Sequence, residues 1–328
     1  MVERIIDAGR EFRNDADTVA DGLFTGRGSR AARMTQFWVL LVLASTIAAG
    51  GVVGNATPAV IGAMIIAPLA TPIYGVALAT VMGSRRDLRD ALLLLLAGIV
   101  VNILIGMLVA FVTFDRMPLD ANPQITGRTA PTVLDLMVAI TVGVAGSFAL
   151  VRRDVSAIVA GVAIAISLVP VLAVVGITLG SGRYDLALGA LLLFATNAAA
   201  IIVAGVVVFS AAGYAGAVEG RRPQGRRRAK VVIAVLLVVL LIPLAALSAR
   251  TYFYQVWMNG AHAAAETWVA GSSWRVEDVR QLGGSIVVTV LGSGDSLPLE
   301  EFRTAVRRVV PATVPITLIE GSGRSIQL

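Results

Sequence analysis

The sequence contains no cysteine and a single histidine, and only 15% of its residues are charged. The absence of cysteine excludes disulfides, thiolate metal sites and cysteine nucleophiles. His262 has no potential ligands near it in the sequence, and no nucleophile–base or metal-binding pattern occurs elsewhere, so we expect neither an enzyme nor a cofactor. A soluble domain carries about 25% charged residues. This chain therefore has too little polar surface to cover itself in water.

Apolar residues dominate instead: 57% of the chain is hydrophobic and the mean hydropathy is +0.83. A membrane-spanning helix needs about 20 mostly apolar residues, because backbone groups cannot stay unpaired in lipid. Seven runs meet this requirement: 36–54, 58–82, 91–114, 132–151, 155–180, 186–212 and 231–249. We expect an all-α polytopic membrane domain over residues 36–249, in contact with membrane lipid.

The net charge of +6 does not indicate a nucleic-acid partner, because the basic residues lie between the hydrophobic runs. With the N-terminus inside, fourteen of the lysines and arginines that flank the runs fall on the cytoplasmic side and four on the opposite side. This bias predicts a multi-pass protein of the cell (inner) membrane with a cytoplasmic N-terminus and an extracytoplasmic C-terminus.

Residues 1–35 form a polar tail without a cleavable signal peptide. Apolar residues recur in it at loosely helical spacing, among them Val19, Leu23 and Phe24. The pattern favours an amphipathic helix, either on the cytoplasmic membrane surface or docked on another subunit. A partly ordered tail is the alternative.

An internal repeat is the most informative feature. Residues 59–111 align with 157–209 without a gap, and sixteen of the 53 pairs are identical, including Pro72 with Pro170 and Arg85 with Arg183. Chance predicts roughly 6–8 identities for so biased a composition. We therefore expect two copies of a three-helix unit, 36–114 and 132–212, plus an extra span at 231–249. A copy with an odd number of spans ends on the opposite side of the membrane from where it began, so the second copy must be inverted. The charge bias requires the same inversion.

Inverted repeats are typical of secondary transporters, whose sites lie near the membrane midplane on broken helices. Pro68 and Pro72, one turn apart, predict a break that frees backbone carbonyls around residues 67–71. Simple kinks in packed helices are the alternative interpretation. The candidate site combines backbone and neutral side chains from both copies: Gly62, Ala67, Pro68, Thr71, Pro72, Asn102, Ser167, Pro170, Thr196 and Asn197.

Asn102 and Asn197 are the polar residues of the third and sixth runs, and the repeat places them on similar faces. Each either makes an interhelical hydrogen bond, worth about 0.6–2 kcal/mol, or binds the solute. No charged residue lies deep in any predicted span, which disfavours a proton-coupled carboxylate mechanism. Arg183 and Asp185, with their mates in the first copy, are expected to be interfacial anchors or local salt bridges.

Three strings carry a family resemblance: GNATPAVIGAMIIAPLATPI (54–73), SLVPVLAVVGI (167–177) and ALGALLLFATNAAAI (187–201). They resemble the signature of the "domain of unknown function 389" family, over about residues 36–212. The resemblance places Gly62, Pro68, Pro72, Pro170 and Asn197 at motif positions. The sequence departs at Ala70 and Thr71, where members often have bulkier residues or glycine. It implies a membrane fold and no particular activity.

Residues 250–328 change character. A helix is expected at 252–270, and strands at 274–279, 285–291 and 315–320 surround a helix at 299–310. This order predicts a small α/β soluble domain of ferredoxin-like type, which we interpret as an assembly or sensing module.

These observations favour a secondary transporter of an unknown small solute or ion, assembled as a homo-oligomer. An oligomeric channel is the first alternative. A non-transporting envelope scaffold or sensor that acts through the C-terminal domain is the second.

Overall fold

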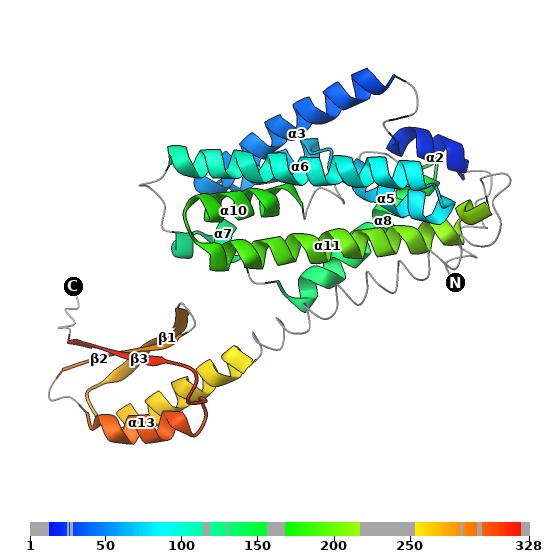
Figure 1. Cartoon of the computed structure of the whole chain (residues 1–328). Coiled ribbons are helices and arrows are strands. Elements are labelled where there is room, and N and C mark those ends of the chain that lie inside the picture. The colour runs from blue at the N-terminus through cyan, green and yellow to red at the C-terminus, as the bar shows by residue number, and fades with distance from the viewer. Residues whose placement is uncertain are drawn as a thin grey trace. The chain divides into compact units, whose positions relative to one another are not determined.

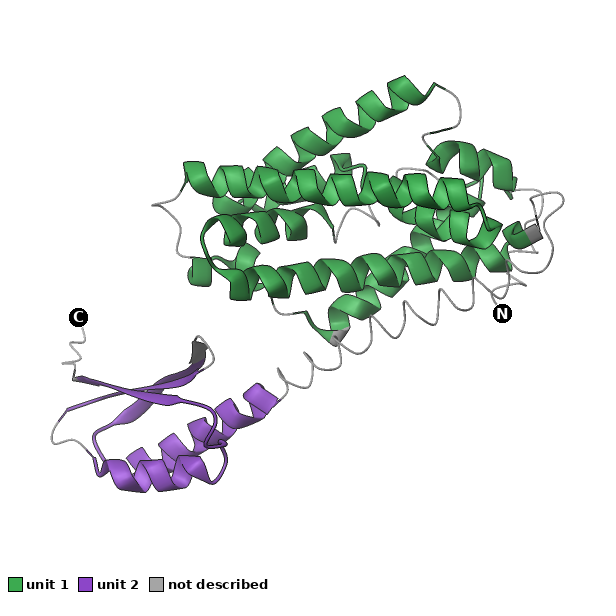
Figure 2. Cartoon of the chain, viewed as in Figure 1, with its two compact units in different colours: residues 1–245 green, residues 246–328 purple. Residues whose placement is uncertain are grey.

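The computed structural model describes residues 13–24, 26, 29–113, 119–129, 131–155, 168–216, 253–282, 285–293 and 297–322. The chain divides into two compact units, Met1–Ala245 and Ala246–Leu328 (Figure 2). The first unit is helical, and the second contains a small mixed sheet.

Long apolar helices build the first unit (Figure 1). The long helices are α3 (Arg30–Val53), α6 (Arg85–Val112), α8 (Val133–Val151) and α11 (Tyr184–Ala211). The shorter helices are α2 (Ala16–Leu23), α4 (Thr57–Ile66), α5 (Ala70–Met82) and α10 (Val169–Gly180). Single turns lie at η2 (Leu119–Ala121), α7 (Pro123–Thr126) and η3 (Tyr214–Gly216).

Helices occupy five of the predicted runs: 36–54, 58–82, 91–114, 132–151 and 186–212. Among the described residues, four helices are long and apolar enough to cross a membrane, or five if α4 and α5 are one span bent by 43°. Run 155–180 is described chiefly as α10, and run 231–249 lies outside the described residues. Seven spans therefore stay a prediction.

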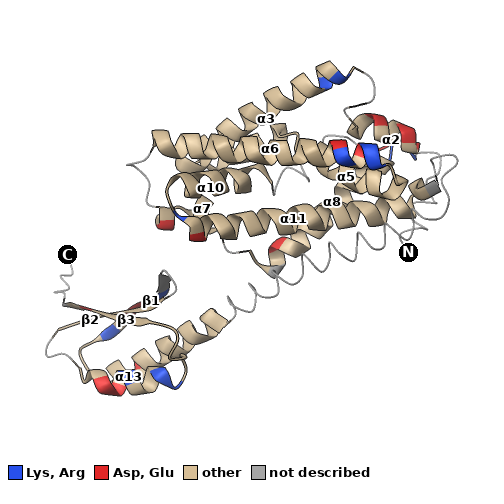
Figure 3. Ribbon diagram, in the orientation of Figure 1, with Lys and Arg blue, Asp and Glu red and all other residues tan. Residues whose placement is uncertain are grey.

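The outer surface of this unit is apolar. Large side chains with more than half of their surface exposed line the long helices, among them Leu43, Leu96, Leu108, Leu134 and Leu188. The charged residues that Figure 3 marks on the unit lie at helix ends instead. Apolar surface of this extent with polar ends fits a membrane and not water, so the unit is that of a membrane-associated protein.

The two short helices α5 and α10 both pack between α6 and α11, while α3 covers α6 and α8 covers α11. Glycine allows the closest of these contacts. A Cβ added to Gly176 of α10 would lie 2.2 Å from the Ile103 carbonyl oxygen of α6, and one on Gly143 of α8 would lie 2.9 Å from Ile201 Cα of α11. Small residues at helix interfaces are how membrane helices approach without a hydrophobic driving force.

The N-terminal segment docks on the same chain. Val19, Ala20 and Leu23 of α2 are buried, and α2 packs on α5. Tyr214 Oη donates to the Asn14 carbonyl at 2.7 Å. The described part of the tail is thus an amphipathic helix, as one interpretation expected, but its apolar face contacts its own helical unit.

The second unit has a three-stranded sheet in the order β1 (Arg275–Leu282), β2 (Ser285–Gly292), β3 (Ile316–Ser322). β1 and β2 are antiparallel, and β2 and β3 are parallel. Residues 253–269 are helical, and α13 (Leu299–Arg307) connects the parallel pair. Ile286, Val288 and Val290 alternate along β2 and share a core with Phe302 of α13. The helices and strands match the predicted order, and the ferredoxin-like type stays a prediction.

Candidate solute-binding site

The break between α4 and α5 covers residues 67–69. Pro68 has no N–H, so the Met64 carbonyl lacks the donor that a continuous helix would supply. α5 begins at Ala70 without a side-chain cap, and its third residue is Pro72. Pro68 and Pro72 therefore end one helix and begin another within a few residues. In the first turn of α5, Pro72 has no N–H and the Thr71 N–H donates to the Pro68 carbonyl at 3.2 Å, so the Ala70 N–H is the donor of this turn that no described residue satisfies.

α10 begins in the same way. Its N-cap residue is Leu168, no side chain caps it, and Pro170 lies in its first turn. Val169 and Pro170 are buried. Ser167, the remaining predicted site residue of this segment, lies outside the described residues.

The two helix N-termini meet along α6. A Cβ on Gly98 would lie 2.9 Å from Leu69 Cδ2, and one on Gly75 of α5 would lie 3.3 Å from Ala91 Cβ. Residue numbers therefore rise along α5 as they fall along α6, which means that α5 runs antiparallel to α6. A Cβ on Gly106 would lie 2.6 Å from the Ala173 carbonyl oxygen, and Gly180 contacts Ala110. α10 therefore runs parallel to α6, and the N-terminal ends of α5 and α10 face each other.

Asn102 lies between these two ends. Gly98, Asn102 and Gly106 are spaced by four residues and so occupy one face of α6. One turn before Asn102 this face contacts Leu69, the residue that precedes α5, and one turn after it contacts the second turn of α10. The Asn102 side chain is 0% exposed, and neither its Nδ2 nor its Oδ1 has a hydrogen-bond partner in the described part of the chain.

Asn197 occupies the corresponding place on α11. A Cβ on Gly205 would lie 2.9 Å from Ala77 Cβ of α5. α11 turns back after α10 and so runs parallel to α5 (Figure 1). Counting back two turns from this contact on each helix leads to Ala70, the start of α5, and to residue 198 of α11. Asn197 is therefore near the level at which α5 begins. Asn197 is 4% exposed, and among the described residues its Oδ1 has no partner.

Ser45 joins this group, and sequence reasoning missed it. Its Oγ is buried and unpartnered within the described residues. Other hydroxyls of the spans, such as Thr80 and Thr178, donate to the carbonyl four residues earlier at 2.7 Å. Leu41 of α3 lies against Gly98, and Ser45 lies one turn further along the same face of α3. The sequence carries no signal for this exception.

The remaining predicted residues have lesser roles in this geometry. Thr196 Oγ1 donates to the Leu193 carbonyl at 3.0 Å and is therefore satisfied within its own helix. Ala67, Pro68 and Thr71 are half-buried at the break. Gly62 lies five residues before the break, and a Cβ there would meet nothing within 4 Å. The close contacts of the site thus come from α5, α6, α10 and α11, with α3 beside them.

A pocket of about 220 Å³ opens at the N-terminal end of α6. Pro72 and Leu94 line it together with Leu23 and Phe24 of the N-terminal segment, and Arg86 and Asp90 are among its charged residues. Pro72 connects this pocket to the first turn of α5. Neither asparagine lines the pocket, so we interpret it as an approach to the break and not as the site itself.

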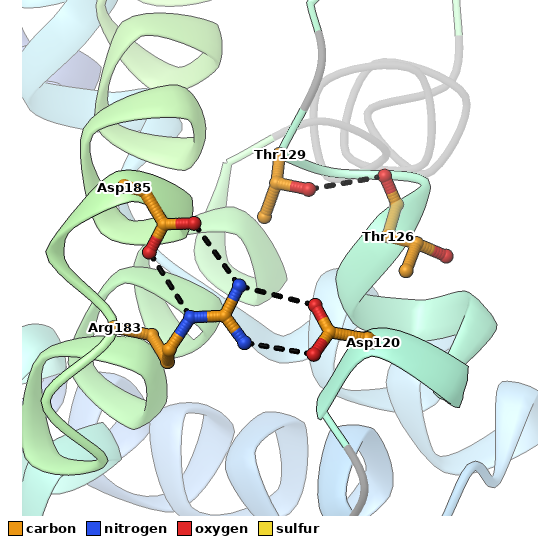
Figure 4. Close-up of polar contacts among 5 residues, drawn as sticks. All are labelled: Asp120, Thr126, Thr129, Arg183 and Asp185. Carbon is orange, nitrogen blue, oxygen red and sulfur yellow. Dashed lines mark hydrogen bonds and ion pairs between the residues drawn. The ribbon is translucent and has the colours of Figure 1, made fainter. Parts of the chain in front are cut away.

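The charged pair predicted at the start of α11 is structural. Arg183 forms ion pairs with Asp120 of η2 at 2.8 Å and with Asp185 at 3.0 Å (Figure 4). The hydrogen bonds that Arg183 donates to Asp185 and Asp120 raise the pKa of its guanidinium above the ordinary value. The network ties η2 to the start of α11, which confirms the local salt bridge expected for Arg183 and Asp185. In the described part of the chain, no three His, Asp or Glu side chains gather as a metal site.

Comparison with known proteins places this helical unit. Residues 64–203 match the family described as Domain of unknown function (DUF389). These residues belong to the DUF389 family. The DUF389 match contains α5, α6, α10 and α11 as far as residue 203, and therefore both asparagines and both short helices.

One curated relative is similar over about half of the chain, and its name gives no activity. The chain is 33% identical over 175 residues to the uncharacterized protein MJ0678 of Methanocaldococcus jannaschii, which is 53% of each chain. The chain thus spans about half the length of this curated relative. No solved structure matches the chain.

Proposed function

We propose that this DUF389 protein transports a small solute across the membrane, with its binding site where the N-termini of α5 and α10 meet between α6 and α11. The observation that carries the proposal is the buried amide of Asn102 at this meeting point, which has no hydrogen-bond partner among the described residues. A transporter needs a polar site deep in an apolar bundle, and it needs broken helices that expose backbone groups there.

The geometry weighs against the structural interpretation of the asparagines. A purely structural asparagine would hydrogen-bond across a helix interface. Tyr74 illustrates this: it is buried, and its hydroxyl donates to the Gly143 carbonyl of α8 at 3.2 Å. Leaving a buried polar group unsatisfied costs about 1–3 kcal/mol. Asn102 and Asn197 bear such a cost in the described structure, and a bound solute would relieve it.

Features shared by the two copies support an inverted arrangement. α6 and α11 each contain 28 residues, and each is preceded by a glycine with a left-handed backbone, Gly83 (φ 69°) and Gly182 (φ 72°). Each short helix packs against the long helices of both copies. We propose that the two copies rock against each other, so that the site between them opens to one side of the membrane at a time.

The test is uptake into liposomes that contain the purified full-length protein. Radiolabelled chloride, formate, phosphate, sodium and glycerol serve as probes of five solute classes. We expect saturable uptake of at least one probe, and we expect Asn102→Leu to abolish it. The matched control is Leu104→Val on the same helix, because Leu104 is 55% exposed on the outer surface.

Two outcomes would overturn the proposal. One is uptake that Asn102→Leu leaves unchanged, which would place the pathway elsewhere. The other is the absence of uptake for all five probes. Single-channel steps in planar bilayers that persist in Asn102→Leu would instead favour the channel alternative.

A further inference from the structure

The electrostatics of the meeting point indicate the charge of the solute. The N-terminus of an α-helix carries roughly half a positive elementary charge and unsatisfied N–H donors. α5 and α10 contain 13 and 12 residues, and neither has a side-chain cap. Two such ends facing each other in a low-dielectric interior repel, unless something negative lies between them.

The described side chains do not supply that negative charge. Asp90 and Asp185 are the acidic residues of α6 and α11 that lie nearest to the two asparagines, and each is twelve residues from its asparagine. At 1.5 Å per residue this separation is about 18 Å. Both carboxylates lie at the ends of the bundle, and Asp185 pairs with Arg183.

The C-terminus of α4 is the negative helix end near the break, and it compensates only part of the positive charge at the starts of α5 and α10. Its last residues, Ile65 and Ile66, are 56% and 39% exposed, so α4 ends at the periphery of the unit. Val169 at the start of α10 is 1% exposed and Asn102 is 0% exposed. The start of α10 therefore lies deeper inside the protein than the end of α4, while Ala70 and Thr71 at the start of α5 are half-buried.

We propose that the solute is a small monovalent anion, such as chloride, nitrate or formate, held between the first turns of α5 and α10. This inference rests on the proposed function and adds the class of solute to it. The backbone N–H groups of Ala70 on α5 and of Val169 and Val171 on α10 donate to the anion, since Pro72 and Pro170 have no N–H and the Thr71 N–H bonds the Pro68 carbonyl. Asn102 Nδ2 donates from α6. Asn197 on α11 and Ser45 on α3 border the same position.

Charge and space limit the anion to this class. Two helix ends together supply roughly one positive charge, and the described spanning helices place no lysine or arginine near the meeting point, so one negative charge is balanced. Gly106 and Gly176 hold α6 and α10 within backbone contact just beyond Asn102. Little room therefore remains for a bulky organic group.

The test measures binding and transport separately on the purified full chain. Thermal unfolding in detergent is followed while sodium chloride, nitrate or formate replaces sodium gluconate at constant ionic strength. A ligand that binds the folded state raises the Tm in proportion to the logarithm of its concentration once the site is saturated. We expect this rise in the wild type and in Leu104→Val.

Two variants distinguish a specific site from a general salt effect. Asn102→Leu removes the donor, and Asn102→Asp places a carboxylate where the anion would lie. We expect both to lose the anion-dependent rise in Tm. The second variant should fold with a circular dichroism spectrum like that of the wild type, because its own charge compensates the helix ends. A rise that persists in both variants overturns the inference.

Combining this assay with the uptake assay separates the two proposals. Sodium or glycerol uptake that depends on Asn102, without any anion effect, refutes the anion inference and leaves transport standing. An anion-dependent Tm that requires Asn102, without uptake of any probe, refutes transport and leaves the anion site standing.

Discussion

Asn102→Leu should make the protein more stable while it removes the proposed function. Leucine has the same number of side-chain heavy atoms and the same branch point as asparagine, but it has no polar atom to satisfy. The wild-type side chain leaves both Nδ2 and Oδ1 unpartnered within the described residues. Such a buried group costs about 1–3 kcal/mol. The methyl groups of the introduced leucine are larger than the amide atoms and lie beside Gly98 and Gly106. Overpacking there will offset about 1 kcal/mol of the gain in stability.

The expected net effect is an increase of up to about 2 kcal/mol in the free energy of unfolding. It corresponds to a rise in Tm of up to about 8 °C. The assay is thermal unfolding in detergent with gluconate as the only anion, followed by far-ultraviolet circular dichroism. Gluconate is too large for the proposed site, so no bound ligand stabilises the wild type.

The sign of the change is diagnostic, because most substitutions of buried residues destabilise. Leu104→Val controls for a change of side chain on α6 away from the site. A Tm for Asn102→Leu that lies several degrees below that of the wild type would refute the reasoning. It would show that Asn102 makes a hydrogen bond on which the fold depends.

Three further predictions test the packing, the ion network and the N-terminal segment. Gly176→Ala should destabilise the protein by about 1–3 kcal/mol, because its Cβ would meet the α6 backbone. The control is Gly62→Ala, since nothing lies within 4 Å of a Cβ at Gly62. Equal Tm values for the two variants would contradict the contact between Gly176 and α6. Arg183→Gln removes the ion pairs with Asp120 and Asp185. It should lower the free energy of unfolding by less than about 1 kcal/mol, because the Arg183 side chain is one-third exposed. The difference in Tm from the wild type should shrink at high salt. Burial raises the pKa of Tyr214 to about 12, so its neutral form stabilises the docked N-terminal segment below pH 10, and this contribution is lost as the pH rises from about 10 to 12. Ultraviolet titration against Tyr214→Phe measures this pKa, and a Tyr214 that ionises at about pH 10 would contradict the burial.

Local sequence features were sufficient to locate the break and the candidate asparagines. Prolines 68 and 72 lie in a long apolar run, where a missing N–H ends a helix whatever packs around it. Asn102 and Asn197 are conspicuous because amides are rare in apolar runs. Chemistry within a few residues decides both features, so composition and spacing were enough.

Contacts between distant segments could not be predicted in the same way. Three features depend on how helices pack in space: the Ser45 Oγ without a partner among the described residues, the Gly106–Gly176 approach and the docking of Asn14 on Tyr214. Nor does the sequence separate Thr196, whose hydroxyl bonds within its own helix, from Asn197, whose Oδ1 has no partner in the described part of the chain. Hydrogen-bond partners follow from the tertiary arrangement and not from residue type.

The sequence by itself determined the membrane class of the chain, the places where its helices end and the polarity of its buried faces, because lipid forces every spanning backbone into a helix and leaves few polar residues. Only the tertiary structure decided that the two short helices meet N-terminus to N-terminus beside Asn102. That meeting depends on the directions in which four helices pack, and the contacts that set those directions join residues as many as 128 positions apart, such as Ala77 and Gly205.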